Sequence, residues 1–272
     1  MPVDIRRKKI YNDTMMKNER NFETENRIRI NKYLSDAGIC SRREADRLTD
    51  EGRVTINGIP VRTGEKINAE AMVCVDGRAV KKEERKVLIL FQKPRGLVCS
   101  MKKQGKDPTV TEFIRYPLRI YPVGRLDKES EGLLLLTNQG ELVNALMRAR
   151  NGHEKEYLVS VNRTVTGSFL KKMREGVPIL NTVTRPCQVQ KTGEKEFRII
   201  LTQGLNRQIR RMCEALGYQV LSLRRIRIMN LRGEDLQMGQ YREIREEEWK
   251  ELSSGLGVPE SLIMSDTGGR RG

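Results

Sequence analysis

The pattern of apolar and polar residues divides the chain into two regions that we expect to fold separately. The first contains IRINKYLSDAGICSRREADRLTDEGRVTING, where helical spacing of apolar residues gives way to alternation, which predicts two short helices and then a hairpin. Ser41, with Glu44 three residues later, is typical of a capping box at the start of the second helix. Asn57-Gly58 predicts a two-residue turn between strands. We therefore expect a compact domain over residues 28–78.

The second region, residues 87–252, contains many short apolar runs, of which VLILF and LLLL are typical of buried strands. Strands and helices do not alternate regularly, as they would in a parallel doubly wound sheet. The pattern favours an α+β fold with a mostly antiparallel sheet. Three further segments lack apolar periodicity. We expect a basic tail at residues 1–27, a linker at 79–86 and a flexible, glycine- and serine-rich tail at 253–272.

An amphipathic helix is predicted in GLNRQIRRMCEALGY, with Asn206 as its cap and Gly217 at its end. Its apolar stripe follows the spacing i, i+3, i+4, i+7 through Ile209, Met212, Cys213 and Leu216. Three arginines (Arg207, Arg210 and Arg211) lie in its first turns. Cations there oppose the helix dipole by about 0.3–1 kcal/mol each when exposed. An anion nearby would explain them, and a solvated basic face is the alternative. In the next strand region the apolar positions change from odd to even near Arg224, which predicts a β-bulge.

The charge balance narrows the class of partner. The 272 residues include 52 Lys and Arg against 36 Asp and Glu, a formal net charge of +16. Such an excess favours a polyanionic partner, nucleic acid ahead of a membrane surface. An apolar stretch of about 18 residues, which could span a bilayer, does not occur in the sequence, and the N-terminal residues lack the apolar core of a signal peptide. We therefore expect a cytoplasmic protein.

Cysteine and histidine usage argues against metal and triad chemistry. The five cysteines are scattered without a CxxC pair, which is typical of reduced thiols in the cytoplasm. His153 is the single histidine, and no nucleophile elbow accompanies it. We expect no metal site.

One acidic residue stands directly before a strongly apolar run in GRLDKESEGLLLLTN. Asp127 either caps a loop at the surface or is a carboxylate held at the edge of the core. Burial disfavours the charged form of a carboxylate unless a cation compensates. In HEKEYLVSV, Tyr157, Val159 and Val161 occupy every second position and therefore share one face of the strand, so Tyr157 is predicted to point inward. Its ring is either core or a flat surface on which a base can stack.

The N-terminal region resembles an S4 domain, a small RNA-binding module. The similarity lies in the two helices, the SRREAD segment and the VTING hairpin. Proteins with this domain dock the start of the second helix and the hairpin on structured RNA. The resemblance implies phosphate contacts, which position RNA more than they read its sequence. The implied contacts are Lys32, Ser41, Arg42, Arg43 and Arg47.

The chain as a whole is similar to the S4-domain ribosomal pseudouridine synthases of the RsuA/RluF type. GRLDKESEGLLLLTN, the K-E-Y strand and GLNRQIRRMCEALGY occur in that family's order, and HEKEYLVSV, GVPIL and NRQIRRMCE resemble its RluF branch most. The resemblance covers about residues 28–250. It implies a catalytic domain with a central cleft, no cofactor, and 23S ribosomal RNA as the partner, with a tRNA anticodon uridine as a further substrate. We expect a monomer.

The same resemblance implies a role for each matching residue. Asp127 matches the family's essential aspartate, Tyr157 the tyrosine that stacks on the target uracil, and Arg210 the arginine that pairs with the aspartate. Arg125 and Ile209 match residues that contact the RNA and the uracil, and Arg207 and Arg211 are expected to be further substrate contacts. Conversion of uridine to pseudouridine breaks the N1–C1′ bond, turns the uracil and joins C5 to C1′. The reaction therefore needs an ionised carboxylate at the ribose.

Two other functions agree with the charge of the chain. The protein could be a non-catalytic assembly factor that clamps ribosomal RNA, although a clamp gains nothing from an acid among arginines. It could also be a hydrolase that releases uracil, although such an enzyme normally needs two carboxylates in partner roles. Glu129 and Glu131 are expected to face solvent.

Overall fold

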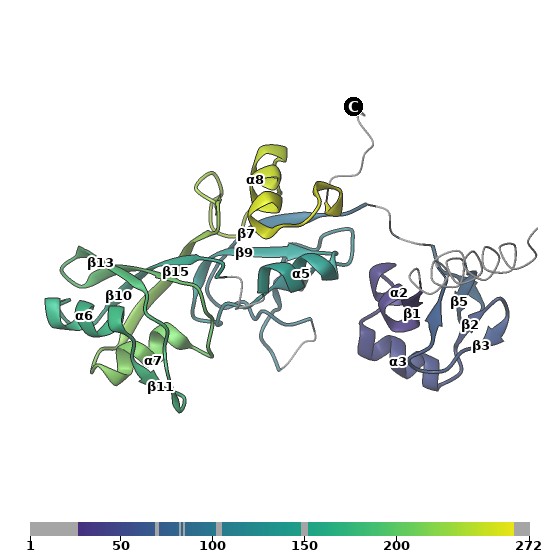
Figure 1. Cartoon of the computed structure of the whole chain (residues 1–272), viewed down its shortest axis with the longest axis horizontal. Coiled ribbons are helices and arrows are strands. Elements are labelled where there is room, and N and C mark those ends of the chain that lie inside the picture. The colour runs from purple at the N-terminus through teal and green to yellow at the C-terminus, as the bar shows by residue number, and fades with distance from the viewer. Residues whose placement is uncertain are drawn as a thin grey trace, which may run out of the picture. The chain divides into compact units, whose positions relative to one another are not determined.

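The computed structural model describes residues 27–68, 71–81, 83, 85–101, 105–147 and 152–263. The chain divides into two compact units, residues 1–84 and 85–272 (Figure 1). The division falls inside the predicted linker at 79–86. The predicted tail at 1–27 lies outside the described residues except for Arg27. Among the described residues, helices long and apolar enough to cross a membrane do not occur.

The N-terminal unit contains the two predicted helices and hairpins. Its elements are β1 (Ile28–Arg29), α2 (Ile30–Asp36), α3 (Arg42–Asp50), β2 (Val54–Ile56), β3 (Ile59–Pro60), β4 (Lys66–Ile67), β5 (Val73–Val75) and β6 (Arg78–Ala79). Ser41 caps α3 by accepting a hydrogen bond from the amide of Glu44 at 3.2 Å. Asn57 and Gly58 both have positive φ, 49° and 82°, and Ile56 pairs with Ile59 across them. The predicted two-residue turn is therefore confirmed, because positive φ at both positions defines its type.

The C-terminal unit is built on one large sheet. Within its described residues, nine strands join in the order β13-β14-β10-β15-β9-β7-β17, with β16 and β8 attached to β15 and β9. These nine strands are β7 (Leu88–Lys93), β8 (Tyr121–Val123), β9 (Glu131–Thr137), β10 (Lys155–Val161), β13 (Gln188–Gly193), β14 (Glu196–Leu201), β15 (Val220–Ile228), β16 (Leu231–Arg232) and β17 (Tyr241–Glu243). A separate two-stranded sheet pairs β11 (Pro178–Ile179) with β12 (Thr182–Val183). The helices are α4 (Val110–Ile114), α5 (Gly140–Met147), α6 (Gly167–Glu175), α7 (Gln208–Ala215), α8 (Glu246–Leu256) and the short η2 (Glu260–Leu262). Its strand pairs are antiparallel except β15 with β9, so the α+β prediction is confirmed.

The four leucines of β9 are buried on both faces of the sheet. Leu133 and Leu135 pack with α5 and α8, whereas Leu134 and Leu136 pack with α4. A strand covered on both faces needs apolar residues at every position, which explains the unbroken run. β9, β7, β17 and β8 form what we call the β9 half of the sheet. β10, β13, β14 and β15 form the β10 half, which has its own core with α6 and α7.

The two halves meet through a short parallel contact between β9 and β15. Arg224 is paired with Glu131, and Arg225 with Gly132. Gly132 has a φ of +102°, which only glycine adopts readily. A Cβ atom at this position would lie 2.2 Å from the carbonyl oxygen of Arg225. The junction therefore requires glycine for both its conformation and its close approach.

Strand β15 contains the predicted bulge. Arg225 pairs with Tyr157 of β10, but the next pair joins Arg227 to Glu156, which leaves Ile226 as an extra residue. The extra residue moves later side chains to the opposite face. This accounts for the change of apolar positions along the strand.

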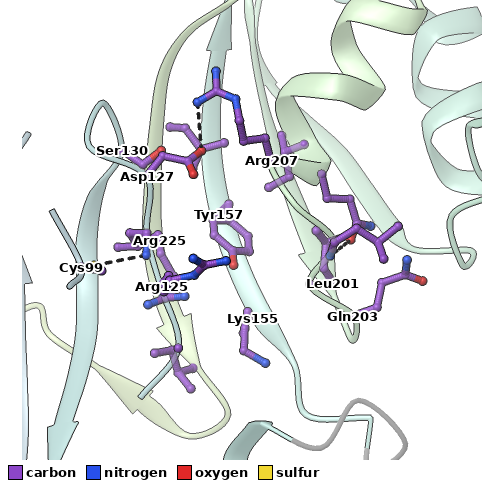
Figure 2. Close-up of a pocket in the computed structure, with 18 of the residues that line it drawn as sticks. Cys99, Arg125, Asp127, Ser130, Lys155, Tyr157, Leu201, Gln203, Arg207 and Arg225 are labelled. Carbon is purple, nitrogen blue, oxygen red and sulfur yellow. Dashed lines mark hydrogen bonds and ion pairs between the residues drawn. The ribbon is translucent and has the colours of Figure 1, made fainter. Parts of the chain in front are cut away.

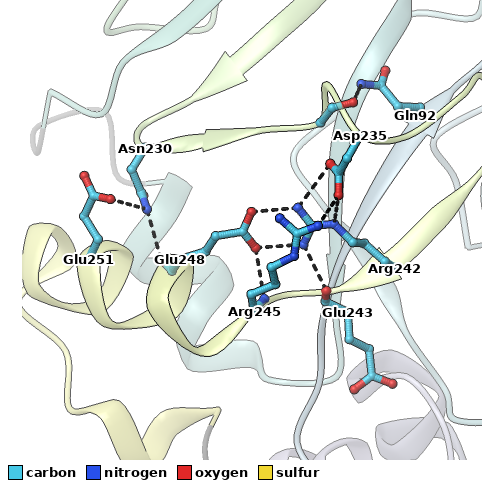
Figure 3. Close-up of polar contacts among 9 residues, drawn as sticks. Gln92, Asn230, Asp235, Arg242, Glu243, Arg245, Glu248 and Glu251 are labelled. Carbon is cyan, nitrogen blue, oxygen red and sulfur yellow. Dashed lines mark hydrogen bonds and ion pairs between the residues drawn. The ribbon is translucent and has the colours of Figure 1, made fainter.

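The folded part of the C-terminal unit extends beyond the predicted boundary at residue 252. Helix α8 continues to Leu256, the indole of Trp249 donates to the carbonyl of Glu260 at 2.8 Å, and Ile263 is only 6% exposed. Arg242 of β17 ties the helix to the sheet, with 2.7 Å contacts to both Asp235 and Glu248 (Figure 3). Residues 253–263 are therefore not a flexible tail. The apolar residues among their glycines and serines fill the core beneath β7 and β9. Residues 264–272 lie outside the described residues.

Candidate active site

Asp127 lies on the loop between β8 and β9, and buried groups hold this loop from behind. The ammonium group of Lys93, a fully buried residue, donates to the backbone carbonyl of Ser130 at 2.8 Å and to that of Asp127 at 3.3 Å. Burial lowers the pKa of Lys93. The amide of Gly96 donates to the carbonyl of Lys128 at 2.8 Å. Because the backbone is fixed in this way, the Asp127 side chain, 33% exposed, has a defined direction.

Two arginines of the α7 region face the carboxylate of Asp127. The distance from Oδ2 is 3.5 Å to Nη1 of Arg207 and 3.7 Å to Nε of Arg210. Arg210 also donates to the carbonyl of Glu129 at 3.3 Å and to the hydroxyl of Ser130 at 3.2 Å. Burial lowers the pKa of Arg210, although Asp127 and Glu129 act in the opposite direction. The anion predicted beside this helix is therefore Asp127, accompanied by Glu129.

The start of α7 differs from the prediction. Arg207, with a φ of 50°, occupies the cap position, and Asn206 does not cap the helix. Instead Asn206 accepts from Arg211, through its backbone carbonyl at 3.1 Å and its side-chain oxygen at 3.3 Å. Arg211 thus folds back on its own loop and does not line the pocket at Asp127. As a substrate contact in this pocket, Arg211 is not supported by the geometry.

Except for Arg210, which lies beside Asp127, the other residues predicted for the site line one cavity of about 490 Å³. They are Arg125, Asp127, Tyr157, Arg207 and Ile209. Figure 2 shows Asp127 and Arg207 at one end of this pocket and Lys155 at the other, with Tyr157 between them. Tyr157 is half-buried, and it packs against both the core of the β10 half and the core beneath α4. This inward position was predicted from its alternation with the buried Val159 and Val161. The cavity therefore has a charged end and a flat aromatic wall.

Several residues of the pocket region were not predicted. Ser130, Lys155 and Arg225 line the cavity, and Lys93 supports the Asp127 loop. Lys155 is two residues from Tyr157 on β10, so strand periodicity alone could have indicated it. Periodicity did not indicate Lys93 or Arg225. Lys93 belongs to the turn-like QKPRG segment, and Arg225 belongs to the bulged strand β15.

Burial lowers the pKa of two basic groups that line the pocket, the amine of Lys155 and the imidazole of His153. It is the main cause that lowers the pKa of Lys155 to about 8, and repulsion by Arg225 adds to it. His153 is buried, its Nε2 lies 3.1 Å from the carbonyl of Ala145, and burial lowers its pKa. Within the described residues, groups of three His, Cys, Asp or Glu side chains that could hold a metal do not occur.

The five predicted RNA contacts of the N-terminal unit fall into two groups. Arg42 and Arg43 are exposed and have no ion pair within the described residues. Arg47 contacts Glu44 and, at 2.5 Å, Glu51. Lys32 lies 3.1 Å from Asp36, and the hydroxyl of Ser41 is used as the helix cap.

Comparison with known proteins agrees with both predicted domains. Residues 87–215 match the family model of RNA pseudouridylate synthase, and residues 28–73 match the S4 domain. The chain is 48% identical over 231 residues to the dual-specificity RNA pseudouridine synthase RluF of Salmonella typhi, over 84% of this chain and 80% of that relative. It is 36% identical over 234 residues to the ribosomal large subunit pseudouridine synthase B of Bacillus subtilis, over 82% and 95% of the two chains.

A solved structure shows the same fold. A crystal structure of a pseudouridylate synthase is 27% identical to this chain, with a TM-score of 0.62 over 83% of this chain and 99% of that one. The sequence identity to curated relatives confirms the resemblance drawn from the motifs. The chain therefore belongs to the RNA pseudouridine synthases that carry an S4 domain, and it is an isomerase of uridine in RNA.

Proposed function

We propose that the protein converts a uridine of 23S ribosomal RNA to pseudouridine, with Asp127 as the catalytic carboxylate. The observation that carries this proposal is the position of Asp127. It lies beside Arg207 and Arg210 at one end of a cavity whose wall includes Tyr157 and Ile209. Cations beside a partly buried carboxylate compensate for its lost contact with water. An ionised carboxylate is what the ribose chemistry requires.

Each residue has a task in this reaction. A target nucleotide flipped out of its stack, at a cost of a few kcal/mol, enters the cavity and lies against Tyr157. Asp127 either attacks C1′ or removes the proton at C2′, and the N1–C1′ bond breaks. Arg210 holds the carboxylate in position through its contacts to Asp127 and Ser130. Tyr157 and Ile209 retain the uracil while it turns, and Arg125 contacts the RNA at the entrance.

The choice of RNA is supported by the printed names of the relatives. One acts on the large ribosomal subunit and another is a dual-specificity RNA pseudouridine synthase. On this basis 23S ribosomal RNA is the main substrate of this chain, and a tRNA anticodon uridine is a second one. Residues 28–78 dock on RNA through Arg42 and Arg43, and residues from 87 onward perform the reaction. In this proposal the protein acts as a monomer in the cytoplasm.

The test is to replace Asp127 and measure both RNA binding and chemistry. Asp127→Asn keeps the size of the side chain but removes its charge. We expect the affinity for a 23S ribosomal RNA transcript to stay within about threefold, whereas pseudouridine formation falls by at least about 10⁴-fold, the scale on which loss of a catalytic group acts. Because the two nucleosides have the same mass, the digested RNA is separated by liquid chromatography, and pseudouridine is identified by its retention and its fragmentation in mass spectrometry.

A neighbouring carboxylate provides the control. Glu129→Gln removes an exposed acid of the same loop that pairs with Arg207 at 3.5 Å, and we expect its rate to stay within about threefold. An active Asp127→Asn variant would show that the Asp127 carboxylate is not needed for catalysis. A wild-type protein that binds the RNA without modifying it would be a clamp, and released uracil would indicate a hydrolase.

A further inference from the structure

The pocket carries more positive charge than its carboxylate can balance. Asp127 is the one acidic residue among its described lining residues. It is already paired with Arg207. Lys128, which also lines the pocket, is paired with Asp107 at 2.7 Å. Arg125, Lys155 and Arg225 are left without a carboxylate within the described residues, and of these Lys155 and Arg225 lie on adjacent strands.

Arg225 is a buried cation with unused hydrogen-bonding capacity. It is only 3% exposed, and its Nε donates to the carbonyl of Leu133 at 2.7 Å. Its Nη2 is buried and has no hydrogen-bond acceptor among the described residues. Buried donors are nearly always satisfied, so an orphaned guanidinium nitrogen in a ligand cavity indicates an acceptor on the ligand.

Strand register brings Lys155 to the same wall. Arg225 is the cross-strand partner of Tyr157, and Lys155 precedes Tyr157 by two residues on β10, so all three side chains share one face of the sheet. Among the residues that the structure describes, the ammonium group of Lys155 has one weak hydrogen bond, 3.4 Å to the carbonyl of His153. Its pKa of about 8 reflects this lack of compensation, and an anion bound beside it would raise that pKa.

The proposed reaction produces an anion in this place. When the N1–C1′ bond breaks, its electron pair remains on the uracil and spreads over N1, O2 and O4. At the same time C1′ bonds to an Asp127 oxygen, or the C2′ proton passes to that carboxylate. In the second half, C5 supplies the electron pair of the C5–C1′ bond and Asp127 is restored. The proton of C5 finally leaves, and N1 gains one, so that the overall change is an isomerisation.

We propose that Lys155 and Arg225 form a cationic wall that binds the carbonyl oxygens of the detached uracil and stabilises its negative charge. The inference rests on the proposed function and deepens it. Tyr157 retains the ring by stacking, whereas the cationic wall stabilises the charge that develops on bond cleavage. Donors prearranged at such a position in a water-poor site act mainly on the transition state, so they raise the rate more than the affinity.

The test separates rate from affinity in the full-length protein. Lys155→Met keeps an unbranched side chain and removes the amine. With enzyme in excess over a 23S ribosomal RNA transcript, we expect the single-turnover rate to fall about 100-fold, the scale for one lost oxyanion donor. The dissociation constant should change less than about threefold. Lys155→Arg restores a cation and should recover the rate to within about tenfold of wild type.

Substitution at C5 of the substrate sharpens the test. Fluorine at C5 stabilises the uracil anion, so the reaction of a 5-fluorouridine transcript depends less on the cationic wall. Because fluorine cannot leave as the C5 proton does, the product measured is the rearranged fluorinated nucleoside, which is separated from 5-fluorouridine by liquid chromatography and identified by its fragmentation in mass spectrometry. The defect of Lys155→Met should shrink to about tenfold with this transcript, since anion stabilisation by the substrate replaces part of what the donor supplied.

A charge-matched control and two contrary outcomes complete the design. Lys191→Met removes an exposed lysine of β13 outside the pocket and should leave the rate within about twofold. If Lys155→Met weakens RNA binding without slowing the single turnover, the lysine binds a phosphodiester and the proposal is wrong. An unchanged rate and affinity would also overturn it. If wild type itself makes no pseudouridine, the proposed function fails instead.

Discussion

The two domains carry positive charge in opposite ways. In the S4 domain several cations are paired with acids a few residues away or on the next strand, such as Arg47 with Glu44 and Glu51, and Arg53 with Asp76 at 2.6 Å. In the catalytic pocket, Lys155 and Arg225 have no such partner among the described residues. Exposed pairs contribute about 0–1 kcal/mol each, whereas an unpaired buried cation costs stability. The comparison indicates that a cation paired within the fold serves structure, and that an unpaired one serves the RNA.

Arg210 is the strongest challenge to this division, because it is paired but its partner is the proposed catalytic carboxylate. We expect Arg210→Met to lower the single-turnover rate by about 100–1000-fold, since Asp127 loses both its position and a compensating charge. Arg211→Met, one residue further on, removes an arginine whose hydrogen bonds within the described part of the chain go to Asn206 of its own loop, and it should change the rate less than about threefold. Similar losses for the two variants would show that α7 contributes general positive charge and no specific pair.

A paired cation of the catalytic domain should affect stability and leave the chemistry intact. Arg242 makes charge-assisted hydrogen bonds to Asp235 and Glu248, and each such bond contributes about 1.5–3 kcal/mol when well buried. Because all three groups are partly exposed, we expect Arg242→Met to lower the free energy of unfolding by about 2 kcal/mol. Urea denaturation measures this, and pseudouridine formation at 25 °C should stay near wild type. A large loss of activity in the folded variant would contradict the comparison.

The same pairs give this stability a pH dependence. Hydrogen bonds from Arg242 hold the pKa of Asp235 below its usual value, and they do the same for Glu248 against the opposing effect of burial. A carboxylate whose pKa is lowered on folding contributes stability above its unfolded pKa, about 4, and loses it as the pH falls through the folded value. The difference between wild type and Arg242→Met should therefore be full at pH 7 and shrink below about pH 4. A constant difference across this range would exclude the ion pairs as its cause.

The smallest effects are expected in the S4 domain, where paired and unpaired arginines lie on one helix. Replacing Arg42 and Arg43 together by Gln should weaken RNA binding about tenfold at low salt, and the slope of log K against log salt should fall by about 1–2. Arg47→Gln should weaken binding less than twofold, because Glu44 and Glu51 already neutralise it. Titrations at several salt concentrations give both quantities. Equal effects of the three arginines would show that bound RNA displaces Glu44 and Glu51 from Arg47.

Much of the fold was predictable because local signals agreed with the final contacts. The Asn57-Gly58 turn, the Ser41 cap and the run of Leu133 to Leu136 each depend on neighbouring residues or on complete burial. The bulge near Ile226 was visible as a change in apolar periodicity. An anion beside the α7 arginines was expected from the unfavourable charge at that helix start, and the family resemblance implied that Asp127 pairs with Arg210.

The remaining features depend on contacts distant in sequence. The loop contacts of Lys93 and the position of Arg225 in the pocket both arise from strand pairing across more than thirty residues. The prediction that Asn206 caps α7 was wrong, because its oxygen atoms accept hydrogen bonds from Arg211 instead. Residues 253–263 were expected to be flexible from their glycines and serines, but Ile263 reaches the core.

The close contact at Gly132 has a consequence for the whole reaction centre. Asp127 belongs to one side of that junction, whereas Tyr157, Arg207 and Arg210 belong to the other. The distance between these groups therefore depends on how closely the backbones of β9 and β15 approach each other, and at Gly132 only a hydrogen atom stands where a side chain would be. Even a methyl group there would meet the backbone of Arg225 at 2.2 Å and push the two strands apart, together with the side chains that they carry into the pocket.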